Sequence, residues 1–331
     1  MEPISQLVML CLGGMAAWLT LAVRERRTTT GECYATVAAS RLRPRHRSGS
    51  RYGVTLTSAI VLGAFGLLAP HLAAAEETAA SDEAVAAPQG SVVRWSGEAE
   101  SCGMGGKTWK ANEGVCYFPI DFEHPAGRIE IARWPKAGER ETRWLDIEDK
   151  DFGEENVEYP DDSLIHLSEE DLARHSREQA EIEPVFKTDT EPVYSLPLAP
   201  PAKPLPEGKE FGVERSFNDV PKSAHTGADY PIGLDNPVHA VAAGKVVLTG
   251  EHLFAGNSVY VDHGDGLVSM YFHLNSIEVE EGQTVAAGDE LGKVGETGRA
   301  TGPHLHLGLR WRDARIDPTL LIGKLQVVDV P

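Results

Sequence analysis

The sequence has little of several residue types, and each shortage excludes a class of protein. Positive charge is scarce: 31 Lys and Arg stand against 50 Asp and Glu, and the net charge of -19 argues against a nucleic-acid-binding protein, which normally presents a basic face. Aromatic residues make up only 7%, whereas 33 Gly and 21 Pro indicate many turns and little long helix. Cysteine occurs four times and never in residues 207–331, so a closed, cysteine-rich metal site is not expected there.

The chain nevertheless contains enough apolar residues for a folded core. Hydrophobic residues make up 41% of its 331 residues and charged residues 24%, which is typical of about two folded domains with appendages. The basic residues are concentrated early: residues 1–51 hold eight Lys and Arg against three Asp and Glu, whereas residues 76–206 carry a net charge of -16 and residues 207–331 one of -8. This asymmetry indicates that residues 1–75 are a membrane-targeting region.

Two short apolar stretches lie in the targeting region. Residues 54–68 follow several arginines and precede Ala73-Ala74-Ala75, so residues 52–75 resemble a cleavable secretory signal peptide. A 15-residue helix spans only about 22 Å, less than the hydrocarbon core of a membrane, which favours cleavage over a permanent span. Residues 7–23 either anchor the chain in the inner membrane, with the Arg-rich residues 24–51 inside, or precede the true start of translation, which we favour. Both interpretations export everything after about residue 75, to the periplasm or beyond.

The cysteines agree with export. Cys11 and Cys33 lie in the targeting region, which leaves Cys102 and Cys116 in the exported part. Because an oxidising compartment favours pairing, we expect a disulfide between these two residues, and two free buried thiols are the alternative.

The region upstream of residue 207 is divided by its composition. Residues 76–90 are acidic and small and predict a flexible start, and residues 91–147 contain short alternating runs that predict a small β accessory module. Residues 148–206 predict an acidic loop over 148–163, a helix that begins after Ser168 and ends near Ile182, and a proline-rich, extended connector over 184–206.

Residues 207–331 predict an antiparallel β domain. Short strand candidates alternate with glycine-containing turns, and no strand–helix alternation indicates a parallel sheet. The candidates are residues 238–242, 245–249, 257–262, 267–273, 277–279, 290–294 and 304–309.

Seven of the 12 histidines fall in this domain, three of them in the patterns HTGAD (225–229) and HLH (304–306). Residues i and i+2 of a strand share a face, so His304 and His306 should project into one site. Two imidazoles with the carboxylate of Asp229 would suit Zn²⁺ and leave one position open for water, whose pKa zinc lowers to about 7. Each pattern alone is weak, because single histidines are more often structural. His273 lies in a third pattern, YFHL (271–274). We expect structural or surface roles for the histidines outside the three patterns, His239, His252 and His263.

The ordered set of motifs resembles the LytM/lysostaphin-type peptidoglycan metalloendopeptidases over about residues 211–321. The matching segments are His225-Thr-Gly-Ala-Asp229, Gly256-Asn257-Ser-Val, Asp262-His263-Gly264, Tyr271-Phe-His273-Leu274, Gly295-Glu-Thr-Gly298 and Gly302-Pro-His304-Leu-His306. The resemblance implies a duplicated hybrid motif fold, one Zn²⁺ per chain held by His225, Asp229 and His306, and two catalytic histidines that are not ligands, His273 and His304. In the family these two orient or deprotonate the water and stabilise the tetrahedral oxyanion.

The resemblance predicts an exported zinc endopeptidase that hydrolyses peptide cross-links between peptidoglycan peptide stems. By analogy with the family, a D-alanyl–diaminopimelate bridge is expected rather than a glycine bridge. The alternative is a non-catalytic LytM-like binding module that activates another cell-wall hydrolase. The residues of the accessory region, 91–206, leave its role open between wall binding, covering of the groove and binding of a partner.

Overall fold

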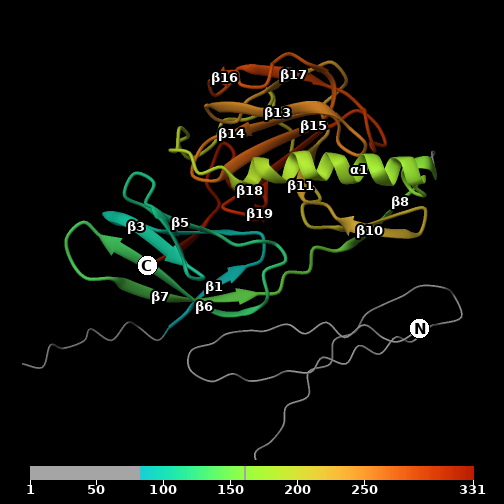
Figure 1. The fold of residues 1–331 in the computed structure, drawn as a ribbon. Coiled ribbons are helices and arrows are strands. Elements are labelled where there is room, and N and C mark those ends of the chain that lie inside the picture. The colour runs from blue at the N-terminus through green and yellow to red at the C-terminus, as the bar shows by residue number, and fades with distance from the viewer. Residues whose placement is uncertain (1–82, 160–161) are drawn as a thin grey trace, which may run out of the picture. The chain divides into compact units, whose positions relative to one another are not determined.

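The computed structural model describes residues 83–159 and 162–331, which are mainly β as predicted (Figure 1). They contain one α-helix, α1 (Glu169–Ile182). The expectations for the targeting region, including the apolar stretches, the cleavage site, Cys11 and Cys33, concern residues outside these ranges and stay predictions. Among the residues that are described, no helix combines the length and the apolar character needed to cross a membrane.

A nine-stranded sheet dominates the C-terminal region, and all its strand pairs are antiparallel. Its main path runs β11-β18-β15-β14-β13-β16, while β12 and β17 pair with each other, β17 also pairs with β15, and β19 pairs with β18. The strands are β11 (Gly227–Tyr230), β12 (Pro237–His239), β13 (Gly244–His252), β14 (Gly256–Asp262), β15 (Leu267–Ile277), β16 (Thr284–Val285), β17 (Glu290–Val294), β18 (Leu305–Trp311) and β19 (Ala314–Ile316). A 3-10 turn, η3 (Pro318–Leu320), follows.

The apolar residues of these strands explain why the sheet forms where the sequence predicts it. Tyr271 of β15 and Leu305, Leu307 and Leu309 of β18 are fully buried in one core cluster, and the spacing of the three leucines matches the period of a strand. The predicted strand at 277–279 is wrong. β15 continues to Ile277 because its end pairs with β17. Residues 278 and 279 follow the strand, although the N–H of Glu278 still donates to the carbonyl of Leu291 on β17 (2.9 Å).

The accessory module consists of two smaller sheets. The five-stranded sheet has the order β1-β7-β6-β3-β4, and the three-stranded sheet has the order β20-β2-β5. The strands are β1 (Val85–Pro88), β2 (Val92–Trp95), β3 (Ala99–Met104), β4 (Lys107–Lys110), β5 (Cys116–Pro119), β6 (Gly127–Pro135), β7 (Glu141–Glu148) and β20 (Val328–Val330). The predicted Cys102–Cys116 disulfide is present and joins β3 of one sheet to β5 of the other.

Several strands lie outside the segments predicted as strands, and β1, β8 (Glu154–Val157) and β20 are three of them. β1 falls within the predicted flexible start, and β8 falls within the predicted acidic loop, so both predictions are wrong for these residues. β1 pairs in parallel with β7, and β8 pairs in parallel with β9 (Glu214–Phe217), which also pairs with β10 (Val220–Ala224). β20 at the C-terminus pairs in parallel with β2, over two hundred residues earlier. Backbone pairing with a distant strand stabilises all three, and local periodicity does not reveal it.

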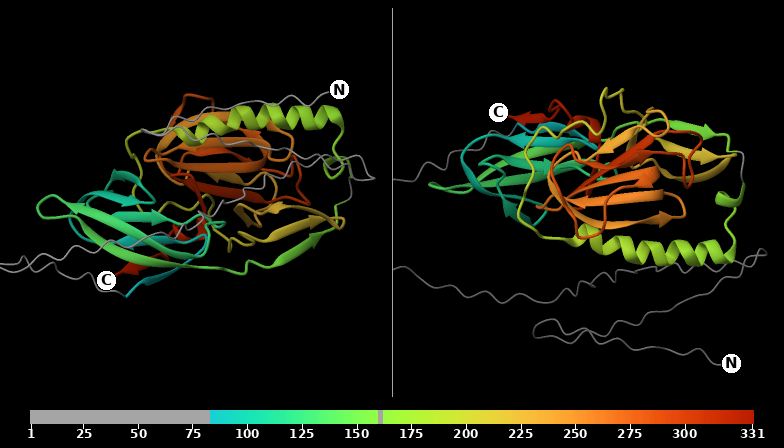
Figure 2. Two further views of the ribbon diagram at one scale, coloured as in Figure 1. Left: turned by 60° about the horizontal axis from the view of Figure 1, so that its bottom comes forward. Right: turned by 90° about the horizontal axis from the view of Figure 1, so that it is seen from above.

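The helix follows its predicted limits, whereas the connector follows them only in part. Ser168 caps α1 by accepting a hydrogen bond from the backbone N–H of Asp171 (3.1 Å), and the helix ends at Ile182 as expected. Two 3-10 turns flank it, η1 (Asp162–Leu164) and η2 (Glu183–Lys187). The prediction of an extended connector is wrong for residues 184–187, which belong to η2. The rest of the connector packs on the domain, since the buried Leu198 donates its N–H to the carbonyl of Leu321 (2.8 Å). Figure 2 shows α1 alongside the large sheet from two further directions.

Candidate metal centre

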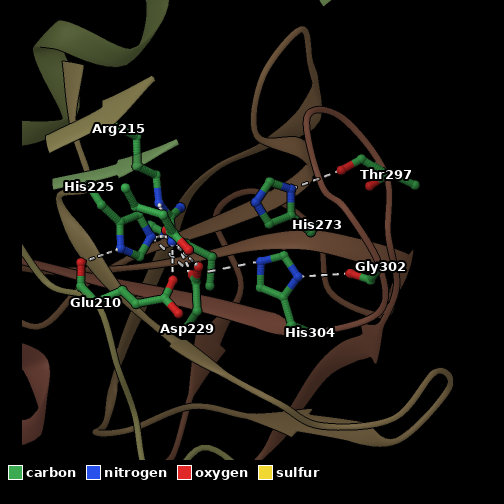
Figure 3. A network of polar contacts seen from close by, with 10 residues as sticks. Glu210, Arg215, His225, Asp229, His273, Thr297, Gly302 and His304 are labelled. Carbon is green, nitrogen blue, oxygen red and sulfur yellow. Dashed lines mark hydrogen bonds and ion pairs between the residues drawn. The ribbon is translucent and has the colours of Figure 1, made fainter. Parts of the chain in front are cut away.

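Two neighbouring strands bring the predicted ligands together. Asp229 on β11 lies directly opposite His306 on β18, and His225 comes two residues before β11. His225 Nε2 and His306 Nδ1 lie 3.0 and 2.9 Å from the same oxygen, Oδ1 of Asp229 (Figure 3). The ligand atoms of the three residues lie within 4.8 Å of one another, as a single metal ion requires.

The surrounding contacts fix which nitrogen of each imidazole faces the cluster. Nδ1 of His225 bonds the backbone carbonyl of Glu210 (2.8 Å), which leaves Nε2 as the ligand atom. The His306 ring stacks on Phe272 with 5.1 Å between ring centroids. Its other edge lies against Gly227, where an added Cβ would come 2.4 Å from His306 Nε2, so only glycine leaves room for this ring.

The protonation states of the cluster suit a divalent cation. Burial opposes the charge on Asp229, but its close contacts with His225 and His306 outweigh burial and hold the pKa of this carboxyl well below its usual range. Burial lowers the pKa of His306 to about 4, so the ring is neutral near pH 7. One carboxylate and two imidazoles, with no cysteine, form the donor set of an open zinc site, and the residues present therefore fit Zn²⁺.

The two other predicted histidines lie beside the ligand cluster. His304 precedes β18, its Nε2 is 3.7 Å from Asp229 Oδ1, and its Nδ1 bonds the carbonyl of Gly302 (2.8 Å). His273 lies on β15, with its ring centroid 4.8 Å from that of His304 and its Nδ1 bonded to the carbonyl of Thr297 (2.8 Å). Because a carbonyl accepts a hydrogen from each Nδ1, each ring in its neutral form has a lone pair on Nε2. Burial, together with His306 and His304, lowers the pKa of His273 to about 3.

A β-bulge directs His273 toward the cluster. The register between β14 and β15 shifts between Asn257 and Val259, so that two residues of β15 oppose one residue of β14. His273 takes a φ of 63°, a left-handed conformation that is uncommon for residues other than glycine and that concentrates at functional sites. All five predicted site residues thus lie together, and the bulge is a feature that the strand pattern did not predict.

A groove of about 460 Å³ runs along the site and is partly lined by α1. His225, His273 and His306 line one part of it, and α1 contributes Glu178 among others. Glu178 is buried and accepts hydrogen bonds from the backbone N–H of Leu253 (2.9 and 3.1 Å), which fastens the helix to the domain. The sequence predicted the helix but carried no sign that it would line the site.

Arg215 of β9 is a site residue that the sequence did not reveal. Its guanidinium lies 2.9 Å from Oδ2 of Asp229, the oxygen that faces away from the two ligand histidines, and it also pairs with Glu210. This contact orients the carboxylate. An isolated arginine 14 positions before Asp229 gives no local signal, and only the pairing of β8, β9 and β10 brings it here.

The remaining histidines of the domain have packing contacts, as expected. His263 is fully buried and bonds the Ala243 carbonyl and the Ser269 hydroxyl, both at 2.7 Å. His252 is buried, bonds the Ser258 hydroxyl (2.6 Å) and lines the groove away from the ligands. His239 lies 3.3 Å from the carbonyl of Pro201.

The site segment matches a family model, and curated relatives share it. Residues 223–318 match the model of Peptidase family M23. The chain is 44% identical to the Peptidoglycan DD-endopeptidase ShyA of Vibrio cholerae over 85 residues, which are 26% of this chain and 20% of that protein. It is 39% identical to the DD-carboxypeptidase/endopeptidase Mpg of Neisseria meningitidis over 94 residues, 28% of this chain and 22% of that protein. The chain therefore spans only about a fifth of the length of these relatives.

A solved structure extends the similarity beyond the site segment. The putative peptidase M23 from Pseudomonas aeruginosa is 30% identical, with a TM-score of 0.54, and the match covers 73% of this chain and 96% of that one. The family model covers only residues 223–318, so much of the similarity to this structure lies outside the segment that forms the metal centre. On this evidence the chain belongs to peptidase family M23.

Proposed function

We propose that the chain is an exported zinc metalloendopeptidase that hydrolyses peptide cross-links of bacterial peptidoglycan. The observation that carries this proposal is the convergence of His225, Asp229 and His306 on one point, with the free Nε2 atoms of His273 and His304 beside it in a groove.

Two of the three ligands are oriented by a hydrogen bond with another part of the chain. His225, Asp229 and His306 would hold Zn²⁺, the carbonyl of Glu210 fixes the tautomer of His225, and Arg215 orients the carboxylate. When bound, zinc would act as a Lewis acid that lowers the pKa of a water molecule and polarises the substrate carbonyl.

The two flanking histidines supply the proton chemistry. Nε2 of His304 can take a proton from the attacking water as the new C–O bond forms, and can then give it to the amine as the C–N bond breaks. Nε2 of His273 faces the same space from the other strand, where its lone pair can accept a hydrogen bond from the water and so orient it. The products are one carboxylate and one amine.

The relatives support peptidoglycan as the substrate. ShyA is named a peptidoglycan DD-endopeptidase and Mpg a DD-carboxypeptidase/endopeptidase, and both share the segment that forms the metal centre. We infer from this that the cleaved bond is a D-alanyl–diaminopimelate cross-link.

Location outside the cytoplasm is part of the proposal. The Cys102–Cys116 disulfide fits an oxidising compartment, and the order of arginines, apolar segment and Ala73–Ala75 motif fits export to the periplasm. Anchoring in the inner membrane through residues 7–23 would leave the enzyme on the same side.

Digestion of purified sacculi tests the function. We expect the zinc-loaded exported chain, with about one Zn²⁺ per molecule, to release soluble fragments, and a chelator to stop the release. Zinc-loaded protein that releases nothing would contradict the proposal and favour the binding and activating module. The whole exported chain should be used, because β20 pairs with β2 and a fragment beginning at residue 207 would lose that contact.

A further inference from the structure

An arginine in the loop between β17 and β18 lines the groove next to the metal centre. Arg299 is half-buried and lines the same cavity as His273 and His306. Its Cζ lies 4.4 Å from the ring centroid of Phe217 on β9 and 4.4 Å from that of Phe254. Its backbone N–H donates to the carbonyl of Phe254 (2.9 Å), so both ends of the residue are held in place.

Four arginines line this groove, and Arg299 differs from the other three. Over residues 83–159 and 162–331, no ion pair or side-chain hydrogen bond engages its guanidinium, whereas each of the others pairs with at least one carboxylate. The pairs are Arg215 with Asp229, Glu155 and Glu210, Arg310 with Asp313, and Arg315 with Asp121 and Glu123. Burial lowers the pKa of Arg299, but a guanidinium remains charged at neutral pH.

The loop that carries Arg299 also fixes the orientation of His273. The carbonyl of Thr297 bonds Nδ1 of His273 (2.8 Å), while its hydroxyl accepts from the N–H of Asn257 (2.9 Å) and donates to the carbonyl of Leu274 (2.8 Å). Between Thr297 and Arg299, Gly298 has a φ of 72°, and an added Cβ would come 2.3 Å from the backbone nitrogen of Gly256. The loop is therefore closely packed, and it fixes the position of an arginine that lines the same groove as His273 and His306.

A half-buried arginine that has no anionic partner among the described residues is suited to bind an anion from a ligand. Guanidinium and carboxylate form parallel hydrogen bonds, which are stronger in a partly desolvated site than in water. The aromatic rings on Arg299 hold it without using its N–H donors. A diaminopimelate residue joined through one amine keeps a carboxylate on the adjacent carbon, whereas a glycine inside a bridge has none there.

We propose that Arg299 binds the substrate carboxylate that neighbours the scissile amide and so selects cross-links that carry a free carboxylate at this position. The proposal rests on the proposed function and names a specificity-determining residue for it. It predicts that a glycine bridge, or a cross-link whose carboxylate is converted to a carboxamide, is a poor substrate.

A pair of synthetic cross-linked peptides tests this, one with the free carboxylate and one with a carboxamide in its place. We expect the wild-type chain to cleave the acid with a kcat/KM about 10- to 100-fold above that of the amide. Arg299→Gln should lower kcat/KM for the acid by a similar factor and leave the amide nearly unchanged. Arg299→Lys should restore part of the preference, because it keeps the charge but not the paired hydrogen bonds.

Arg140→Gln is the matched control. Arg140 also lies over an aromatic ring, Trp134 (5.6 Å), but it pairs with Glu130 and is outside the groove. The Arg140→Gln variant should show the same ratio of kcat/KM between the acid and the carboxamide peptide as the wild type. If Arg299→Gln lowers the cleavage of both peptides equally, or keeps the preference for the acid, the arginine has only a structural role and the proposal is wrong.

Binding of the amine-side product separates this proposal from the proposed function. Cleavage of neither peptide by the zinc-loaded chain would overturn the proposed function. Calorimetry with the product in its acid and carboxamide forms would still decide on Arg299: tighter binding of the acid by the wild type but not by Arg299→Gln supports the carboxylate site, and equal binding of the two forms contradicts it.

Discussion

The two β regions of the chain bury different kinds of side chain. Among the described residues, the only buried polar side chain before residue 148 is Ser91, and the core there consists of apolar residues and the disulfide. The region of the large sheet buries His225, His273 and His306 in the groove, and also His263 away from it. Buried polar groups reduce stability unless they are paired, so their concentration in one region marks it as the reactive one, whereas the accessory module is built for packing.

Removing a ligand should produce the largest contrast between the regions. In His306→Ala only two protein ligands remain, so we expect zinc content to fall from about one per chain toward zero and hydrolysis to be lost with it. His225→Ala and Asp229→Ala should behave in the same way. Metal analysis and sacculus digestion measure both quantities, with His239→Ala as a control in the same sheet. A His306→Ala protein that keeps its zinc would show that the ligands lie elsewhere.

Removing a flanking histidine should separate chemistry from metal binding. His304→Ala and His273→Ala should keep nearly stoichiometric zinc but lose on the order of 10²–10⁴ in rate, the usual contribution of one acid–base group. Metal analysis measures the zinc content, and sacculus digestion measures the rate. If His304→Ala empties the site while His306→Ala retains zinc, the two assignments are inverted.

Removing the disulfide should affect the accessory module alone. Replacing Cys102 and Cys116 by alanine should cost about 3 kcal/mol of stability, the value expected for a short closed loop. Hydrogen exchange should become faster in β3 and β5 and stay unchanged in β15 and β18, and zinc content should not change. Loss of zinc on reduction would show that the two regions are not energetically separate.

An effect that is absent at neutral pH and appears only in acid is expected at a histidine that directly follows β14, outside the groove. Burial lowers the pKa of His263 in the folded protein to about 4, despite the hydrogen bond to Ala243 and the nearby Asp262, against about 6.5 when unfolded. The unfolded state binds the extra proton, so stability is full above about pH 6.5 and falls by up to about 1.4 kcal/mol per pH unit as the pH decreases toward 4. His263→Gln should make this part of the pH profile of unfolding shallower, and an unchanged profile would contradict the assignment.

How far the sequence predicted the structure also differs between the regions. Around the metal centre, short motifs such as HTGAD and HLH indicate both the strands and the site residues, because the ligands lie on adjacent strands with a regular side-chain period. The bulge at His273 and the contact of Arg215 with Asp229 could not be predicted, since each depends on how distant segments pair.

In the accessory module the alternating runs predict β2, β5 and β6, and the two cysteines predict the disulfide. β1 and β20 lack such a pattern. Both lie at the outside of a sheet and pair in parallel with a distant strand, and the energy that stabilises them comes from that partner. Whether residues 91–147 and 207–331 fold as separate domains stays a prediction.

The central claim is that the zinc-loaded chain hydrolyses a peptide cross-link. Its most direct test is the reaction of the exported chain with a defined D-alanyl–diaminopimelate cross-linked peptide in ¹⁸O-labelled water, followed by mass spectrometry. We expect two products, with one ¹⁸O atom in the new D-alanyl carboxylate and none in the amine-side peptide. An intact cross-link after incubation with protein that holds stoichiometric zinc would contradict the claim.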